Sequence, residues 1–208
     1  MQKLSIVVIL LLASWSARAA SVAILSVDGG FPVVSTGDQL YGWFFTANQG
    51  INVTQLGVFD SENDGLDVAH EVGIYRVSDQ ALLGSAIVPS GTAGSLLNGF
   101  RYTGIAPIAL LSGDYAIVMT MPDSTLDGQN IGSNGLTTAA EITWTGSAFA
   151  GGSALIYPSS EPVFDVGMFG PNFQFSDSAA DAPEPGPAFL LVSGGIALGL
   201  LRRRTLRR

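Results

Sequence analysis

Apolar residues in the middle of this chain recur at every second position, in short runs that end at turn-forming residues. The alternation is plain in residues 53–59 and 72–77, and Asp28-Gly29-Gly30, Asp64-Gly65 and Ser112-Gly113 lie between such runs. A period of two places successive side chains on opposite faces of a β-strand, and Asp-Gly pairs are typical of chain reversals. The central part shows no sustained helical periodicity, so the sequence predicts an all-β fold.

Ten short strands, spaced by roughly 8–15 residues, favour an antiparallel β-sandwich that is jelly-roll-like. They are predicted at residues 22–27, 41–47, 51–59, 71–77, 82–88, 99–105, 114–121, 141–144, 154–157 and 172–175. The glycine-rich residues 146–152 are predicted to form a loose hairpin. The core is predicted from the aromatic residues Trp43, Phe44, Phe45, Phe59, Phe100, Tyr102 and Phe173.

The charge of the chain is very unevenly distributed. Of 208 residues, 47% are hydrophobic and 12% charged, and the formal net charge is −8. Residues 21–181 contain two arginines and sixteen acids, a balance of −14. Such a body repels phosphate backbones, so we expect no nucleic-acid partner. The chain has no cysteine, so an exported domain would be held by its core, with help from a metal as an alternative.

The first nineteen residues have the features of a cleavable signal peptide. Lys3 gives a positive start, residues 4–13 are apolar, and Ala17-Arg18-Ala19 has the small-x-small pattern of a cleavage site. We expect recognition by the Sec machinery and signal peptidase, with cleavage before Ala20.

The last residues combine a proline break, an apolar stretch and a basic cluster. Pro183-Glu184-Pro185 disfavours helix, and residues 188–201 are apolar with three glycines. Fourteen helical residues reach about 21 Å, against about 30 Å of hydrocarbon, so this is a marginal membrane helix. The basic cluster is expected to stay cytoplasmic, with the acidic body outside. It consists of Arg202, Arg203, Arg204, Arg207 and Arg208.

This three-part tail, residues 183–208, resembles the PEP-CTERM sorting signal of Gram-negative bacteria. The resemblance implies that Pro183, Glu184 and Pro185 are recognised by an exosortase, an integral-membrane protease-transpeptidase. It implies a transient anchor in the inner membrane with the body in the periplasm, followed by transfer to the cell surface or release. Whether the helix is removed stays open. Residues 178–182 are predicted to be a linker and residues 20–177 to be the folded domain.

The body carries a second resemblance, through Gly42-Trp43-Phe44-Phe45, residues 51–57, residues 70–75, residues 99–102 and residues 171–175. It is similar to a β-sandwich domain of uncharacterised function found in exported proteins with such tails. This resemblance implies a fold and no activity.

An acidic segment between two predicted strands has the spacing of a calcium loop. Asp60, Glu62 and Asp64 stand at loop positions 1, 3 and 5, Gly65 at position 6 and Glu71 at position 12. Strands flank the loop, so it is not an EF-hand. The alternatives are a structural calcium site formed by the four carboxylates and a solvated acidic turn.

No coherent catalytic set is visible, which favours a non-enzymatic function. His70 is the only histidine, and no Gly-x-Ser-x-Gly elbow is present. We therefore expect an envelope- or matrix-associated protein that binds or embeds in exopolysaccharide. Trp144, Tyr157 and Tyr41 are expected to pack in the core, with a sugar-stacking platform on an outer face as the alternative. The alternatives are a polysaccharide hydrolase with paired carboxylates and a calcium-stabilised adhesin or carbohydrate-binding module.

Overall fold

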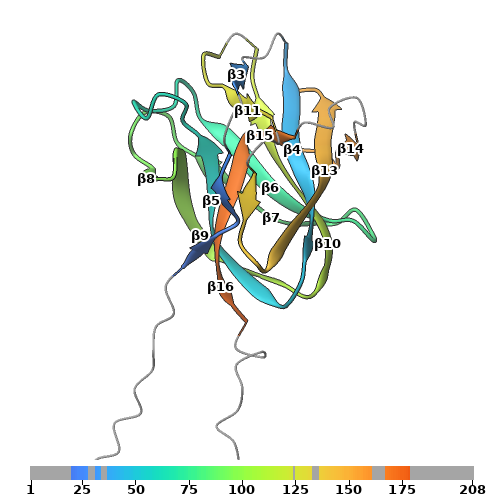
Figure 1. Ribbon diagram of the computed structural model, residues 1–208. Coiled ribbons are helices and arrows are strands. Elements are labelled where there is room, and N and C mark those ends of the chain that lie inside the picture. The colour runs from blue at the N-terminus through green and yellow to red at the C-terminus, as the bar shows by residue number, and fades with distance from the viewer. Residues whose placement is uncertain are drawn as a thin grey trace, which may run out of the picture.

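The computed structural model describes residues 20–27, 31–33, 37–123, 125–132, 136–160 and 167–178. These residues form antiparallel β-sheets joined by turns and loops, with no helix among them (Figure 1). The expected all-β, antiparallel, jelly-roll-like sandwich is confirmed. The predicted signal helix and C-terminal helix lie outside the described residues, as do Pro183, Glu184, Pro185 and the arginine cluster. No helix in the described ranges is long and apolar enough to cross a membrane.

Two sheets build the sandwich, and the larger has six strands in the order β14-β13-β4-β10-β6-β7. Its strands are β4 (Gln39–Ala47), β6 (His70–Arg76), β7 (Leu82–Val88), β10 (Gly113–Met121), β13 (Ile142–Gly151) and β14 (Ser159–Ser160). The second sheet has the order β1-β16-β5-β9-β8. Its strands are β1 (Ser21–Val22), β5 (Ile51–Phe59), β8 (Ser95–Leu97), β9 (Phe100–Leu110) and β16 (Pro171–Asp177).

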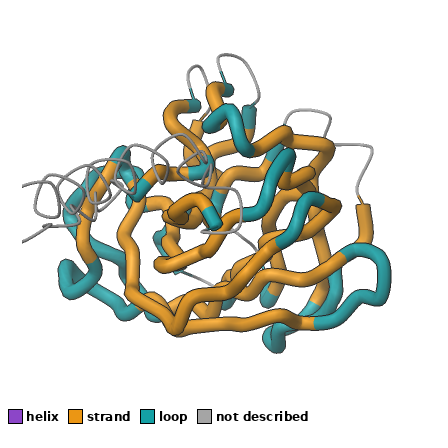
Figure 2. The backbone as a smooth tube through the Cα atoms, turned by 90° about the horizontal axis from the view of Figure 1, so that it is seen from below, coloured by secondary structure: helices purple, strands orange, loops and turns teal. Residues whose placement is uncertain are grey.

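Two small sheets complete the described part of the fold. One has the order β15-β11-β3 and the other pairs β12 with β2. Their strands are β2 (Ile24–Ser26), β3 (Phe31–Val33), β11 (Gln129–Ile131), β12 (Thr137–Thr138) and β15 (Met168–Phe169). Seen from below, the strands curl around the core as a curved wall (Figure 2).

The core lies between the two large sheets because alternate residues of their strands face inward. Trp43 and Phe45 on β4 meet Phe173 on β16, and the rings of Trp43 and Phe173 stack with centroids 5.9 Å apart. The Trp43 Nε1–H donates to the carbonyl oxygen of Pro171 across 2.8 Å. This buried bond joins the two sheets and satisfies the indole donor, which would be costly to bury alone.

The outer face of the six-stranded sheet is apolar as well. Ala116, Val118 and Ala148 are buried there, and Leu155 and Tyr157 pack over them. A Cβ placed on Gly73 would lie 3.0 Å from a Leu155 methyl carbon, so the sheet surface and its cover are in close contact. The segment after β13 is therefore a cover laid across the sheet.

This arrangement corrects two sequence predictions. Residues 154–157 were predicted to be a strand but form none, because their apolar side chains cover the outer face of the sheet. Residues 146–152 were predicted to be a loose hairpin, but β13 continues through Gly151 after a bulge between Trp144 and Gly146. At the end of the domain, the Ser178 N–H still donates to the Gly50 carbonyl oxygen, and the other predicted linker residues lie outside the described part.

Candidate functional site

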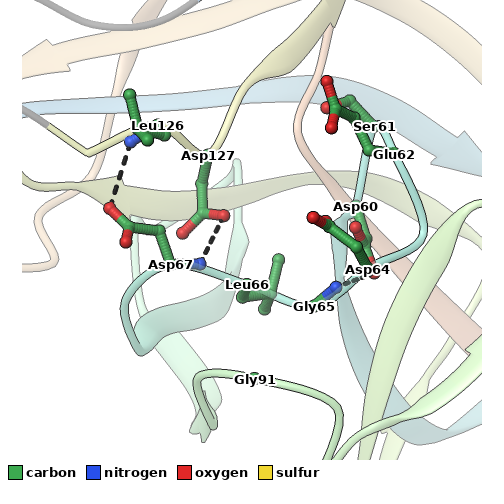
Figure 3. A pocket seen from close by; sticks show the side chains of 10 residues that line it. All are labelled: Asp60, Ser61, Glu62, Asp64, Gly65, Leu66, Asp67, Gly91, Leu126 and Asp127. Atoms are coloured by element: carbon green, nitrogen blue, oxygen red, sulfur yellow. Dashed lines mark hydrogen bonds between the residues drawn. The ribbon is translucent and has the colours of Figure 1, made fainter.

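A pocket of about 440 Å³ opens at the end of the sandwich where β5 and β10 finish and β6 begins. The β5–β6 loop forms one wall and the segment after β10 the other (Figure 3). Five carboxylates line it: Asp60, Glu62, Asp64, Asp67 and Asp127. Figure 3 shows Asp60, Glu62 and Asp64 on one side of Leu66 and Asp67 and Asp127 on the other.

Asp60 forms a buried ion pair at one side of this pocket. Its Oδ2 accepts from Arg101 Nε across 2.7 Å, and the two side chains are only 2% and 7% exposed. The same oxygen accepts from the Gly65 N–H at 3.1 Å. Arg101 Nη2 donates to the carbonyl oxygen of Asn63, and Nη1 to that of Gly94. Arg101, on β9, therefore holds the β5–β6 loop against the sheet.

Asp127 fastens the other side. Its Oδ1 accepts from the Asp67 N–H at 2.7 Å, and its Oδ2 from the Val68 N–H at 2.9 Å. Oδ2 also lies 2.8 Å from His70 Nε2. Burial alone would raise the pKa of Asp127, but the hydrogen bonds from His70 and from the two backbone N–H groups outweigh it and lower that pKa.

Both ring nitrogens of His70 are occupied. Nδ1 lies 2.6 Å from the Thr120 carbonyl oxygen, and Nε2 faces Asp127. A carbonyl and a carboxylate are both acceptors, so each ring nitrogen faces a hydrogen-bond acceptor. The side chain is fully buried. His70 thus connects β6 to the segment after β10, and in this arrangement it presents no free nitrogen to a substrate.

The two walls of the pocket are also tied by Asp67. Its Oδ2 accepts from the Leu126 N–H at 3.2 Å, while the Asp67 N–H donates to Asp127. Thr125 Oγ1 donates to Asp127 Oδ2 at 3.2 Å and accepts from the Asp127 N–H. These reciprocal bonds place Asp67 and Asp127 in one network at the pocket's edge.

The floor is formed by close backbone packing of the loop on Gly91. Leu66 and Gly91 exchange two backbone hydrogen bonds. Gly65 has φ +120°, and a Cβ there would lie 2.8 Å from the Gly91 carbonyl carbon. The predicted reversal at Asp64-Gly65 therefore needs glycine both for its dihedral angle and for space.

Of the four predicted calcium ligands, the structure places three in this pocket and one elsewhere. Glu62 and Asp64 are exposed, and neither side chain has a hydrogen bond or ion pair with another described residue. Glu71 lies on β6, and its Oε1 accepts from Ser85 Oγ at 3.0 Å. Glu71 does not line the pocket.

The fit of a cation is limited by the existing pairs. Asp60 is already paired with Arg101, and Asp127 is already bonded to His70 and to two backbone N–H groups, so Glu62, Asp64 and Asp67 remain as candidate ligands. Within the described ranges, no three acidic or histidine side chains converge closely enough to hold a metal ion as they stand. Binding would therefore require the exposed side chains of Glu62 and Asp64 to rotate toward a common centre.

The three aromatic residues of the alternative sugar platform do not lie together. Tyr41 is buried on the inner face of β4, and Trp144 packs against Phe169 at the core. Tyr157 is half-exposed on the outer face, where its ring meets Phe44 and Tyr75. The expected core packing is therefore confirmed for Tyr41 and Trp144, and the alternative of a sugar platform does not apply to them.

Sequence reasoning missed Asp67 and Asp127 as parts of the site. Asp67 lies inside the predicted calcium loop at a position where that pattern has no side-chain ligand. Asp127 is 57 residues from its partner His70, and an Asp-Gly pair by itself indicates only a turn. The one available signal was that a lone buried histidine needs an acceptor.

No model of a known protein family matches the chain, and a search of curated proteins finds no similar sequence.

Proposed function

We propose that this chain is an exported, exosortase-sorted β-sandwich protein that associates with the cell envelope or its exopolysaccharide and catalyses no reaction. The observation that carries the proposal is the order of four segments: a leader, an acidic body, Pro183-Glu184-Pro185 with an apolar stretch, and an arginine cluster. In this proposal signal peptidase, the Sec machinery and an exosortase are processing partners. The body is the part that acts at the cell surface or outside the cell.

Two features of the described residues support a non-catalytic role. The only histidine of the chain is buried, with both ring nitrogens engaged, so it is poorly placed to move a proton. Two of the five pocket carboxylates are already paired with Arg101 and His70. Both pairs join separate elements of the fold, which is a structural role.

The sorting proposal is tested by fractionating the full chain in a host that contains an exosortase. Wild type is compared with a variant carrying Pro183→Ala, Glu184→Ala and Pro185→Ala. Asp181→Ala, which removes a charge two residues before the motif, is the control. We expect the triple variant to stay in the inner-membrane fraction while wild type and control reach the surface or medium. Identical processing of all three proteins would overturn the proposal.

The alternative function is hydrolysis of polysaccharide by paired carboxylates, since five line a single pocket. Incubation of the purified full chain with neutral and acidic polysaccharides, followed by a reducing-sugar assay, separates the two functions. Release that is lost in Asp64→Asn would replace the non-enzymatic proposal with this one.

A structural calcium ion in the acidic pocket is a second candidate role, favoured by the unpaired state of Glu62 and Asp64. If calcium binds there, millimolar calcium should raise the melting temperature of the full chain, and chelator should reverse the rise. Asp64→Asn should abolish the shift. Glu71→Gln, which removes a carboxylate outside the pocket, should leave it unchanged. Equal behaviour of the two variants, or no shift in wild type, would rule out calcium at this place.

A further inference from the structure

A second hollow, of about 510 Å³, lies beside the outer face of the six-stranded sheet, where β4, β10 and β13 meet the cover segment. Its lining combines aromatic rings with hydroxyl and carboxylate groups. Phe44, Asp114, Thr145 and Tyr157 are among the residues that line it. Unlike the acidic pocket, this groove has a largely apolar wall.

The aromatic wall is held in place by packing. The Tyr157 ring meets Phe44 edge-on at 6.3 Å and Tyr75 edge-on at 5.9 Å. The residue after Tyr157, Pro158, is buried. Leu155, two residues before Tyr157, packs against Gly73. Tyr157 is therefore anchored on both sides along the chain, and its ring needs no reordering to receive a flat apolar ligand surface.

Polar groups along the same groove have hydrogen-bonding atoms that are not used by other described residues. Asp114 Oδ1 accepts from Thr46 Oγ1 at 2.6 Å, so its other oxygen is available. The hydroxyl groups of Thr145 and Tyr157 have no hydrogen-bond partner among the described residues. Thr145 sits in the bulge of β13, which turns its side chain out of the regular alternation. The hydroxyl groups of Thr145 and Tyr157 can each donate a hydrogen bond to a ligand hydroxyl and accept one from it.

The charge of the body restricts the ligand further. Its only two cations are Arg76 and Arg101, and each is paired with an aspartate. A phosphate or uronate ligand would find no unpaired cation and would meet a strongly acidic surface. The groove therefore suits an uncharged ligand.

We infer that this groove binds an uncharged oligosaccharide segment. The apolar face of a sugar ring packs on Tyr157 and Phe44, and its hydroxyls bond to Asp114 and Thr145. Aromatic packing combined with a few placed polar groups is the usual design of small-ligand sites. The inference deepens the proposed association with exopolysaccharide and rests on it, and it commits to neutral chains.

The test is titration calorimetry of the purified full chain with cellohexaose, maltohexaose, xylohexaose and, as the anionic probe, hexa-mannuronate. Asp114→Asn removes a charge-assisted bond without changing shape, and Tyr157→Leu removes the ring. Glu62→Gln, in the acidic pocket, is the matched control for loss of one carboxylate. We expect at least one neutral probe to bind, with Asp114→Asn weakening it about tenfold or more. Tyr157→Leu should weaken it by a similar factor, and Glu62→Gln should have no effect.

Three results would overturn the inference: no binding of any neutral probe, binding unchanged in Asp114→Asn, or tighter binding of the anionic probe than of the neutral ones. If Tyr157→Leu does not fold, Asp114→Asn decides alone. The readout is independent of sorting. A chain that is processed at Pro183-Glu184-Pro185 but binds no sugar contradicts only the groove, and a chain that binds sugar but is not processed contradicts only the sorting proposal.

Discussion

Arg101, the second residue of β9, lies beside the end of β5, where its Nε donates to Asp60 Oδ2 across 2.7 Å with both side chains almost wholly buried. The other arginine of the body, Arg76, pairs with Asp79 at 3.1 Å on the surface, where both side chains are exposed to solvent. A body with sixteen acids thus uses one of its two cations to fix a single buried carboxylate.

Breaking the buried pair should be far more costly than breaking the exposed one. Asp60→Asn leaves Arg101 buried without its charge partner, and we expect a loss of about 3–5 kcal/mol in the free energy of unfolding. The matched change at the exposed pair, Asp79→Asn, should cost no more than about 1 kcal/mol. Urea unfolding followed by circular dichroism measures both, and similar losses would contradict the buried role of Asp60.

Asp127 should make stability depend on pH in the acid range. Its pKa in the folded state is lowered, so the stabilisation is complete above the unfolded value of about 3.9 and is lost as pH falls through the folded value. Asp127→Asn should lower stability at pH 7 and flatten the decline below about pH 4. Urea midpoints of the two proteins at pH 7, 5 and 3 test this. A constant difference between them across the series would show that Asp127 does not carry the effect.

Gly65 should tolerate no side chain. Gly65→Ala forces a Cβ into φ +120° and toward the Gly91 carbonyl carbon, at a cost of about 1–3 kcal/mol in stability. Gly91, which packs against Gly65, has φ +66°, but a Cβ added there would have no atom within 4 Å, so Gly91→Ala should cost only about 1–2 kcal/mol for the dihedral angle. Thermal unfolding ranks the two variants, and the reverse order would contradict the close approach.

Replacing Tyr102 by phenylalanine should make the fold more stable. Its hydroxyl is buried without a hydrogen-bond partner in the described part of the chain, and burial raises its pKa. Because Tyr102→Phe removes an unsatisfied polar group, it should stabilise the fold by about 1 kcal/mol. Tyr115→Phe is the counterpart, since the Tyr115 hydroxyl donates to the Leu111 carbonyl oxygen at 2.9 Å, and it should destabilise by a similar amount. Chemical unfolding of both variants gives the two signs.

The fold could be predicted where one face of a strand is buried and turns are marked. The limits of β5 and β7 match the prediction residue for residue, because the run 51–59 lies between Gly50 and Asp60 and the run 82–88 stops at Pro89. The prediction fails on the outer face of the six-stranded sheet. There Ala116 and Val118 are buried as well as their inward neighbours, and the apolar residues that cover them read as one more strand.

The candidate site could be predicted only in its local part. Asp60, Glu62 and Asp64 lie within five residues, so spacing alone brings them to one loop. Asp127 and Arg101 belong to other elements. Their pairing with His70 and Asp60 depends on how the strands are arranged in the fold. The local sequence around Asp127 or Arg101 does not identify these partners.

The position of β16 has a consequence for how the protein is made. This strand, ending at Asp177, lies between β1 and β5, so the last described strand of the chain joins the first strand to the rest of its sheet (Figure 1). The hydrogen bond from Trp43 that joins the two sheets also needs Pro171, the first residue of β16. The earlier strands can pair with one another during synthesis, but β1 gains its partner and the two sheets gain the Trp43 bond only after β16 has left the ribosome.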